Sequence, residues 1–350
     1  MLSGGGQTTG QYETEGMYTN VKPKVLIAVH HLGRRAIPYV RRLEEAGCKV
    51  VVTPLDRVYT EDELIQALPG VFATMAGGER YTDRVFREAK DLKLVARFGV
   101  GYEKVDVSAA TRHGVIIAMA FGTNHESVAD CAFGMMAALA KNLVTNHLRV
   151  KAGGWGFDLH RGLWRSTVGV VGLGRVGKAM ARRCRGFEMQ VLAYDVQPDT
   201  AFARDNGIIL VPLETLLREA DFVTLHVPHT PETENLINGK RLALMKRTAF
   251  LVNTARGALV DEEALYTALA SGMIAGAGLD VFKREPPTGS PLLTLENVIL
   301  SPHGADADAT TEAAVADRCI ASILAVARGK SPGRECVLNP KVLPSGRIDI

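Results

Sequence analysis

A glycine cluster in the middle of the chain constrains the fold more than any other feature. Residues 167–177 read TVGVVGLGRVG, a short apolar run followed by the pattern Gly-x-Gly-x-x-Gly and then by a stretch typical of a helix. A second apolar run, at residues 190–194, ends next to Asp195, about 20 residues after the first glycine. Glycines at this spacing let a strand turn tightly into a helix whose N-terminus faces a pyrophosphate. The pattern predicts a Rossmann-type dinucleotide-binding domain.

Asp195 indicates which dinucleotide the domain binds. A carboxylate at the end of the second strand can accept hydrogen bonds from the adenosine ribose, and it would face the extra phosphate of NADP. Two negative charges about 4 Å apart repel by roughly 4 kcal/mol at an effective dielectric constant near 20. NAD is therefore the predicted cofactor. The alternative is that Asp195 only caps the turn that follows it, where Asp is common.

Short β-branched runs alternate with helical patterns on both sides of this cluster. Such an order predicts an α/β protein with parallel sheets, and we expect two Rossmann-like or flavodoxin-like domains with a cleft between them. The expected boundaries are a disordered tail at residues 1–20, a substrate-binding (catalytic) domain of residues 21–121 plus 306–350, and an NAD-binding domain of residues 122–305. Long helices are expected over residues 126–151 and 306–328.

Composition and charge exclude several other classes of protein. Lys and Arg number 41 against 38 Asp and Glu, a net charge of +3 with 47% apolar residues. That balance excludes disorder of the whole chain and gives no electrostatic footprint for nucleic acid. The five cysteines are scattered without C-x-x-C spacing, which predicts no metal site and fits a reducing cytoplasm. The longest apolar stretch, residues 132–140, is too short to span a bilayer, so we expect no membrane partner.

Charged residues follow three of the expected strands in the second half of the chain. Arg256, Glu285 and His303 lie in the segments NTARGALVD, LDVFKREPP and SPHGA. Because ligands bind beyond the carboxyl ends of parallel strands, we expect these three side chains to meet at one rim. Taken singly, each could be an ordinary surface or loop residue. Together, a cation, a carboxylate and an imidazole suit the reduction of a 2-keto acid.

Each of these groups has a role in that chemistry. The planar fork of Arg256 can bind a carboxylate at two points. His303 can donate a proton to the carbonyl oxygen as hydride arrives, and accept one in the reverse direction. A hydrogen bond from His303 to Glu285 would raise the imidazole pKa and fix its tautomer.

At these residues the chain resembles the D-isomer-specific 2-hydroxyacid dehydrogenase family, which includes phosphoglycerate dehydrogenase and glyoxylate/hydroxypyruvate reductase. The likeness runs from Lys24 to Pro340 and is carried by ARFGVGYEKVDV, VGLGRVG, HVPHTPETENLIN, NTARGALVDEEAL, AGLDVFKREPP and SPHGA. It implies NAD-dependent interconversion of a D-2-hydroxy acid and its 2-keto acid, with Arg256, Glu285 and His303 as the catalytic residues.

The resemblance also implies further contacts. The backbone at Val100 and Gly101 would bind the substrate carboxylate together with Arg256 and His303, and Asp280 would hold the nicotinamide carboxamide. The helix that begins near Glu126 would form a homodimer contact. The implied cofactor-binding residues are Gly172, Gly174, Arg175, Val176, Gly177, Asp195, His226, Val227, Pro228, Thr233, Thr254, Ala255, Arg256, Asp280, His303 and Gly304.

One departure from the family pattern bears on the substrate. Phosphoglycerate dehydrogenases usually have an arginine where Ala76 stands, although Arg80 is near and could replace it as a phosphate anchor. Glyoxylate, hydroxypyruvate and 3-phosphoglycerate therefore remain candidates. A second hypothesis, from another class, is an NADH-sensing interaction protein resembling the C-terminal binding corepressors, but no charged or low-complexity extension favours it.

Overall fold

The computed structural model describes residues 22–157 and 159–343, and these residues form two compact units. Of the described residues, unit 1 comprises 22–120 and 317–343, and unit 2 comprises 121–157 and 159–316. The helix α12 (Ala309–Ala327) contributes residues to both units. The tail predicted at residues 1–20 lies outside the described residues.

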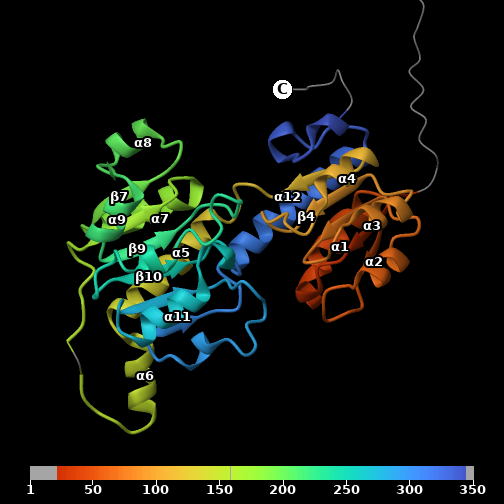
Figure 1. The fold of residues 1–350 in the computed structure, drawn as a ribbon. Coiled ribbons are helices and arrows are strands. Elements are labelled where there is room, and N and C mark those ends of the chain that lie inside the picture. Colours follow the sequence, from red (N-terminus) through yellow and green to blue (C-terminus); the bar gives the residue numbers. More distant parts are fainter. Residues whose placement is uncertain (1–21, 158, 344–350) are drawn as a thin grey trace, which may run out of the picture. The chain divides into compact units, whose positions relative to one another are not determined.

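Unit 1 is built on a parallel sheet of five strands in the order β2-β1-β3-β4-β5 (Figure 1), so the predicted parallel α/β architecture is confirmed here. Its strands are β1 (Lys24–Ile27), β2 (Lys49–Val52), β3 (Ala73–Ala76), β4 (Leu94–Arg97) and β5 (Ile116–Met119). Its helices are η1 (His30–Ala36), α1 (Ile37–Glu45), α2 (Glu61–Ala67), α3 (Asp83–Glu88) and α4 (Val107–Arg112), followed by the C-terminal half of α12.

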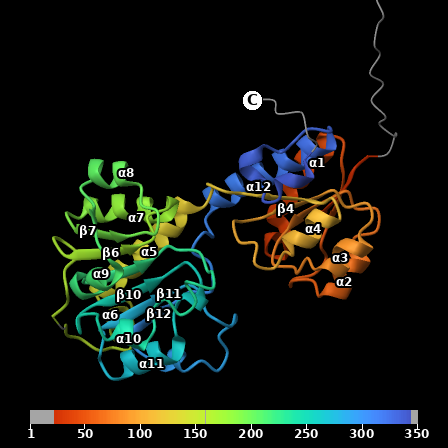
Figure 2. The same ribbon diagram turned by 45° about the horizontal axis from the view of Figure 1, so that its top comes forward.

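Burial in unit 1 follows the order of the strands. Every residue of the central strands β3 and β4 is buried, whereas the edge strand β2 is half exposed. The C-terminal half of α12 lies beside α1 (Figure 2), where Arg42 pairs with Asp317. The chain then returns to β5, and the Asn339 side chain accepts a 2.9 Å hydrogen bond from the Ile117 N–H.

Unit 2 is built on a parallel sheet of seven strands in the order β12-β11-β10-β9-β6-β7-β8. Its strands are β6 (Thr167–Val171), β7 (Gln190–Tyr194), β8 (Ile209–Leu210), β9 (Phe222–Leu225), β10 (Phe250–Asn253), β11 (Gly276–Leu279) and β12 (Val298–Leu300). Its helices are α5 (His125–Ala140), α6 (Leu143–Lys151), α7 (Arg175–Gly186), α8 (Thr200–Asp205), α9 (Leu213–Glu219), α10 (Gly239–Leu242) and α11 (Glu262–Ala270). The two-residue strand β8 was not predicted because it is too short to show a period.

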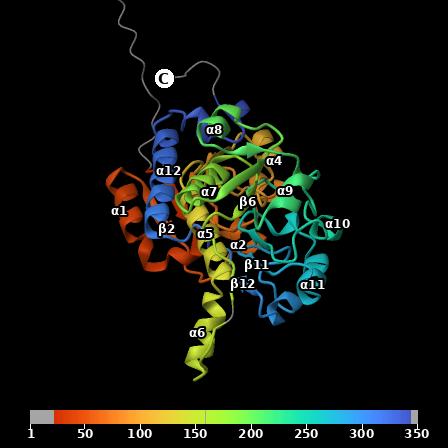
Figure 3. The same cartoon turned by 90° about the vertical axis from the view of Figure 1, so that its left-hand side faces the viewer.

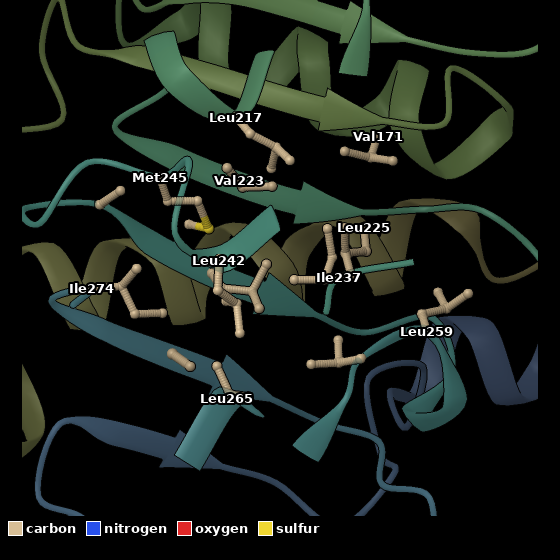
Figure 4. Packing of buried hydrophobic residues seen from close by; sticks show 14 of the residues in the cluster. Val171, Leu217, Val223, Leu225, Ile237, Leu242, Met245, Leu259, Leu265 and Ile274 are labelled. Carbon is tan, nitrogen blue, oxygen red and sulfur yellow. The ribbon is translucent and has the colours of Figure 1, made fainter. Parts of the chain in front are cut away.

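Helices cover both faces of the unit 2 sheet. On one face, Leu217 of α9, Leu242 of α10 and Leu265 of α11 pack with strand residues such as Val223 (Figure 4). On the other face, α5 and α7 enclose a second buried cluster that includes Met136. A rigid sheet held from both sides keeps the loops at its strand ends in defined places.

The prediction of one continuous helix over residues 126–151 is wrong. Helix α5 ends at Ala140, α6 begins at Leu143, and the two axes are bent by 61°. Asn142 lies between them in the left-handed backbone region (φ 49°), which Asn tolerates better than most residues. None of the residues of α6 is buried, and Figure 3 shows it extending away from the sheet of its own unit.

Among the described helices, no single one is long and apolar enough to cross a membrane, whereas the bent pair α5 and α6 meets the criteria of length and composition when counted together.

Candidate active site

The glycine loop after β6 is shaped by two different requirements. Gly172 has φ 95°, and a Cβ added there would lie 2.6 Å from the His226 carbonyl oxygen. A Cβ on Gly177 would lie 1.9 Å from the carbonyl oxygen of Gly172. Gly174, in contrast, has φ −74° and no protein atom within 4 Å of the place a Cβ would take. The fold itself therefore requires Gly172 and Gly177, and the open side of Gly174 leaves room for a ligand.

The residues around this loop fit a bound dinucleotide. Helix α7 begins at Arg175, so its unpaired N–H groups and positive dipole end lie beside the open side of Gly174. Arg175 is exposed and Val176 is half-buried. The Thr254 hydroxyl, at the end of β10, is buried without any hydrogen-bond partner in the described residues, as expected of a polar group that a ligand satisfies.

Asp195 connects the end of β7 to the glycine loop. Its Oδ2 accepts a 2.7 Å hydrogen bond from the Leu173 N–H, and its Oδ1 accepts a 2.8 Å bond from the Gln197 N–H. The turn-capping alternative is thus part of its role. Each carboxylate oxygen keeps a further acceptor site, so binding of the adenosine ribose stays a prediction that this geometry permits.

The segment after β9 carries four of the predicted cofactor contacts. His226 accepts or donates a 2.9 Å hydrogen bond between Nε2 and the Thr224 hydroxyl, and burial of the ring lowers its pKa to about 3, which keeps the ring neutral. Val227 packs against the core. The Thr233 hydroxyl donates to the Pro228 carbonyl (2.8 Å) and so closes the turn between them.

His303 and Glu285 form a hydrogen-bonded pair at the carboxyl end of the sheet. His303 Nδ1 lies 2.7 Å from Glu285 Oε2, and Glu285 Oε1 accepts a 3.1 Å bond from the Phe282 N–H. The hydrogen bond to Glu285 raises the pKa of His303, and desolvation opposes it only in part. The His303 side chain is 51% exposed, and its Nε2 makes no hydrogen bond to the described residues. That nitrogen can therefore exchange a proton with a bound molecule.

Asp280 holds the loop that carries His303. Its carboxylate is fully buried and accepts hydrogen bonds from the Gly304 N–H (2.9 Å), the Ala305 N–H (3.0 Å) and the Ser301 hydroxyl. The Asp280 carbonyl also accepts a 2.8 Å bond from the His303 N–H. His303 has a left-handed backbone (φ 53°), which is strained for a non-glycine residue and needs such support. The predicted contacts of Asp280 with the nicotinamide and of Gly304 with the cofactor stay predictions.

Arg256 follows β10 in a turn organised by Asn253. The buried Asn253 side chain donates to the Arg256 carbonyl (2.8 Å) and accepts from the Ala255 N–H (3.0 Å). The Arg256 guanidinium donates to the Ala255 carbonyl (2.7 Å), and its charge acts to lower the pKa of His303, so the two side chains lie within electrostatic range of each other. Sequence reasoning missed Asn253. A polar Asn at the end of the apolar run TAFLVN was the sequence signal that could have indicated it.

The predicted substrate-binding residues of unit 1 follow strand β4. Val100 and Gly101 are both half-exposed. No described residue of the protein accepts a hydrogen bond from their N–H groups. The role of Val100 and Gly101 in binding substrate stays a prediction.

Ala76 stands where phosphoglycerate dehydrogenases usually have an arginine. It is the fully buried last residue of β3, whereas Arg80 is exposed.

Comparison with known proteins indicates the same family as the motifs do. A model of the D-isomer specific 2-hydroxyacid dehydrogenase NAD binding domain matches residues 133–305. A glyoxylate reductase of Korarchaeum cryptofilum is 45% identical over 71% of this chain and 77% of its own length. A D-3-phosphoglycerate dehydrogenase of Methanocaldococcus jannaschii is 40% identical over 79% of this chain, which spans only 53% of that protein. The crystal structure of D-lactate dehydrogenase from Aquifex aeolicus with NAD and lactic acid has a TM-score of 0.80 at 28% identity, covering 90% of this chain and 99% of that one.

The fold, the glycine loop and the His303–Glu285 pair define an NAD-dependent oxidoreductase. The chain belongs to the D-isomer specific 2-hydroxyacid dehydrogenase family, as the resemblance in its motifs predicted. Its reaction class is the NAD-dependent oxidoreduction of 2-hydroxy acids, and the corepressor-type alternative is not favoured.

Proposed function

We propose that the enzyme reduces glyoxylate or hydroxypyruvate to the corresponding 2-hydroxy acid. The observation that carries the proposal is the 2.7 Å hydrogen bond between His303 Nδ1 and Glu285 Oε2, which leaves Nε2 of this 51% exposed side chain available as a proton donor. The preference for a small substrate is supported by the buried Ala76 at the end of β3, which supplies no cation for a phosphate, and by the similarity to a glyoxylate reductase.

In this proposal the three side chains divide the chemistry. When bound, NADH supplies the hydride. Arg256 binds the substrate carboxylate, and His303 transfers the proton on Nε2 to the carbonyl oxygen. Glu285 keeps the imidazolium stabilised and holds its Nδ1–H. In the oxidative direction His303 accepts the hydroxyl proton. In unit 1, the N–H groups of Val100 and Gly101 are the proposed donors to a substrate carboxylate.

We place the two ends of NAD at the two groups of predicted contacts in unit 2. Gly174 and the N-terminus of α7 would hold the pyrophosphate, and Asp195 would hold the adenosine ribose. Thr254, whose hydroxyl lacks a partner in the described residues, and His303 would contact the nicotinamide. When bound, the nicotinamide would supply or accept the hydride.

We further propose that the enzyme is a cytoplasmic homodimer whose contact includes α6 and the segment that follows it. Large apolar side chains there are exposed in the single chain: Leu148 by 59%, Trp155 by 91%, Phe157 by 87% and Trp164 by 63%. Several large exposed apolar side chains within one segment of chain favour a protein interface there. Five free cysteines are consistent with a reducing compartment. Light scattering should give twice the chain mass, and Leu148→Asp should reduce it to that of a monomer.

The experiment that tests the proposed reaction is NADH oxidation with glyoxylate, hydroxypyruvate, pyruvate and 2-ketoglutarate, with NAD reduction by 3-phosphoglycerate beside it. Fast turnover of glyoxylate or hydroxypyruvate is expected. Faster turnover of 3-phosphoglycerate would contradict the proposed substrate. It would indicate that Arg80, which is exposed in the loop after β3, binds the phosphate. Tight NADH binding without turnover of any of these acids would instead favour a binding protein.

A further inference from the structure

A buried arginine joins two loops at the carboxyl edge of the unit 1 sheet. Arg97 is the last residue of β4 and is only 8% exposed. Its Nε donates a 3.1 Å hydrogen bond to the Gly101 carbonyl, and its Nη1 donates to the Gly77 carbonyl. One guanidinium therefore connects the loop after β3 with the loop after β4. Its planar fork can bind two carbonyls in different directions, which a lysine ammonium cannot do with the same fixed geometry.

The loop after β4 is shaped to receive an anion. Gly99 has φ 138°, and the described residues offer no acceptor to the next two N–H groups, those of Val100 and Gly101. Two backbone hydrogen bonds fix the start of the turn at residues 99–101. The Gly99 N–H donates to the Arg97 carbonyl (3.0 Å), and the Ala120 N–H donates to the Gly99 carbonyl (3.3 Å). Its far end is held by Arg97, through the bond to the Gly101 carbonyl. Successive backbone N–H groups that face outward form anion-binding concavities.

A buried carboxylate accompanies this arginine. Glu79 is fully buried, and neither of its oxygens has a hydrogen-bond partner in the described residues. Burial raises the pKa of Glu79, and the backbone N–H groups of Glu79 and Gly77 together with the charges of Arg97 and Lys104 oppose that rise. A buried carboxylate that no donor meets at full hydrogen-bond geometry destabilises the fold by itself, but it lowers the free energy of the buried cation near it. Glu79 thus acts on Arg97 through its charge and not through a hydrogen bond.

We propose that Arg97 is a positioning residue for the substrate: its guanidinium holds the turn at residues 99–101 so that the N–H groups of Val100 and Gly101 face the substrate carboxylate, and Glu79 is its buried counter-charge. This inference rests on the proposed function and adds a residue to it. Preorganised donors bind an anion more tightly because the cost of ordering them is met during folding. A displacement of about 1 Å in such a group can reduce catalysis by about 10²-fold.

The test compares Arg97→Lys with Glu79→Gln in the full-length enzyme. Arg97→Lys keeps the charge and loses the two-point hold on the loops, whereas Glu79→Gln removes the counter-charge and leaves both hydrogen bonds of Arg97 in place. Three quantities are measured for each variant: KM and kcat for glyoxylate, the Kd of the carboxylate oxamate in the NADH complex by fluorescence, and the thermal midpoint.

Arg97→Lys is expected to raise KM for glyoxylate and Kd for oxamate at least about tenfold, with kcat changed less than about threefold and NADH affinity unchanged. Glu79→Gln is expected to lower the thermal midpoint and to leave both constants within about threefold. A merely structural cluster would lower the midpoint in both variants and leave KM and Kd unchanged, which would overturn the proposal. Equal losses of oxamate binding in both variants would also overturn it, since the hydrogen bonds would then not be the cause.

The wild-type enzyme separates this inference from the proposed function. If it neither turns over a 2-keto acid nor binds oxamate, the proposed function is wrong, and the role of Arg97 falls with it. If it does both while Arg97→Lys behaves as the wild type, only the role of Arg97 is wrong. Should Arg97→Lys not fold, Gly101→Pro provides a second test. Residue 101 donates no hydrogen bond within the described residues, so the loss of its N–H is expected to weaken oxamate binding while Arg97 stays intact.

Discussion

The carboxyl edges of the two sheets are equipped in opposite ways. At the edge of unit 2, an exposed imidazole is hydrogen-bonded to a carboxylate, in the pair His303 and Glu285. At the edge of unit 1, the ionisable pair Arg97 and Glu79 is buried, whereas Val100 and Gly101, whose N–H groups donate to no described residue, are half-exposed. The difference shows that parallel α/β sheets impose where a site forms but not its chemistry. One edge is suited to transfer a proton, and the other is suited to hold an anion.

The physical reason lies in what each task requires. A proton donor must have a pKa within reach of the working pH and an atom open to the substrate, which the half-exposed His303 has. A donor to an anion needs fixed geometry and no change of charge, which backbone N–H groups supply.

Removal of the imidazole separates the two edges most clearly. His303→Ala should lower kcat by about 10²- to 10⁴-fold, because the proton must then come from water. The affinity for oxamate in the NADH complex should fall far less, since the unit 1 edge keeps its N–H groups. Steady-state kinetics and fluorescence titration measure the two effects. If NADH binding is lost as well, His303 has been given the wrong role.

Removal of the negative charge of Asp195 is expected to have the next largest effect, on the preference for NADH over NADPH. Asp195→Asn should raise the ratio of kcat/KM with NADPH to that with NADH by about 10²-fold, within the roughly 4 kcal/mol of repulsion expected between two charges about 4 Å apart. The asparagine side chain can still accept a bond from the Leu173 or Gln197 N–H, so the turn should survive. Asp195→Ala, which removes both bonds, is the control for stability. An unchanged cofactor ratio would mean that this carboxylate only caps the turn.

The glycine loop of unit 2 is likewise proposed to bind an anion through its N–H groups, and it offers a matched pair of variants. Gly174→Ala should weaken NADH binding about tenfold and leave the thermal midpoint unchanged, because a Cβ there meets only ligand. Gly177→Ala should prevent unit 2 from folding normally, because its Cβ would lie 1.9 Å from Gly172 O. Circular dichroism melting and NADH titration distinguish them. Normal NADH affinity in Gly174→Ala would place the pyrophosphate elsewhere.

The smallest effect concerns the pH range of the reaction. Glu285 raises the pKa of His303, so the protonated form needed for reduction persists to higher pH. The rate of reduction should fall as pH rises through that pKa. In Glu285→Gln the pKa is lower and the fall should begin at lower pH, with a several-fold loss at neutral pH that shrinks in acid. A profile of kcat/KM against pH measures this. Coincident profiles would show that Glu285 does not tune the imidazole.

Much of unit 2 could be predicted because its signals are local. The run of strand, glycines and helix at residues 167–177 lies within one contiguous stretch, and the structure places β6 and α7 there. The positions of Arg256, Glu285 and His303 followed from another general rule, that the carboxyl ends of parallel strands share one edge. Residue type and strand order were therefore enough to predict the rim on which the three lie.

The break between α5 and α6 shows where local patterns fail. Residues 126–151 are rich in helix-forming residues, and nothing in that pattern marks Asn142 as left-handed. The bend arises because α5 packs against the sheet and α7, whereas α6 has no buried residues and leaves that surface. Tertiary packing of one half of a helical stretch, and its absence in the other half, decides where the helix ends.

By itself, the sequence determined the parallel α/β architecture, the cofactor class and the chemical types at the active edge, because these depend on short periodic patterns and on fixed motif spacing. Only the tertiary structure decided how the loops are held. Asp280 reaches the backbone of Gly304, and Arg97 reaches the Gly77 carbonyl, across 24 and 20 residues of sequence respectively. Such bonds depend on which loops the sheet order brings together and on how deeply each charge is buried, and neither quantity is encoded in any local stretch of residues.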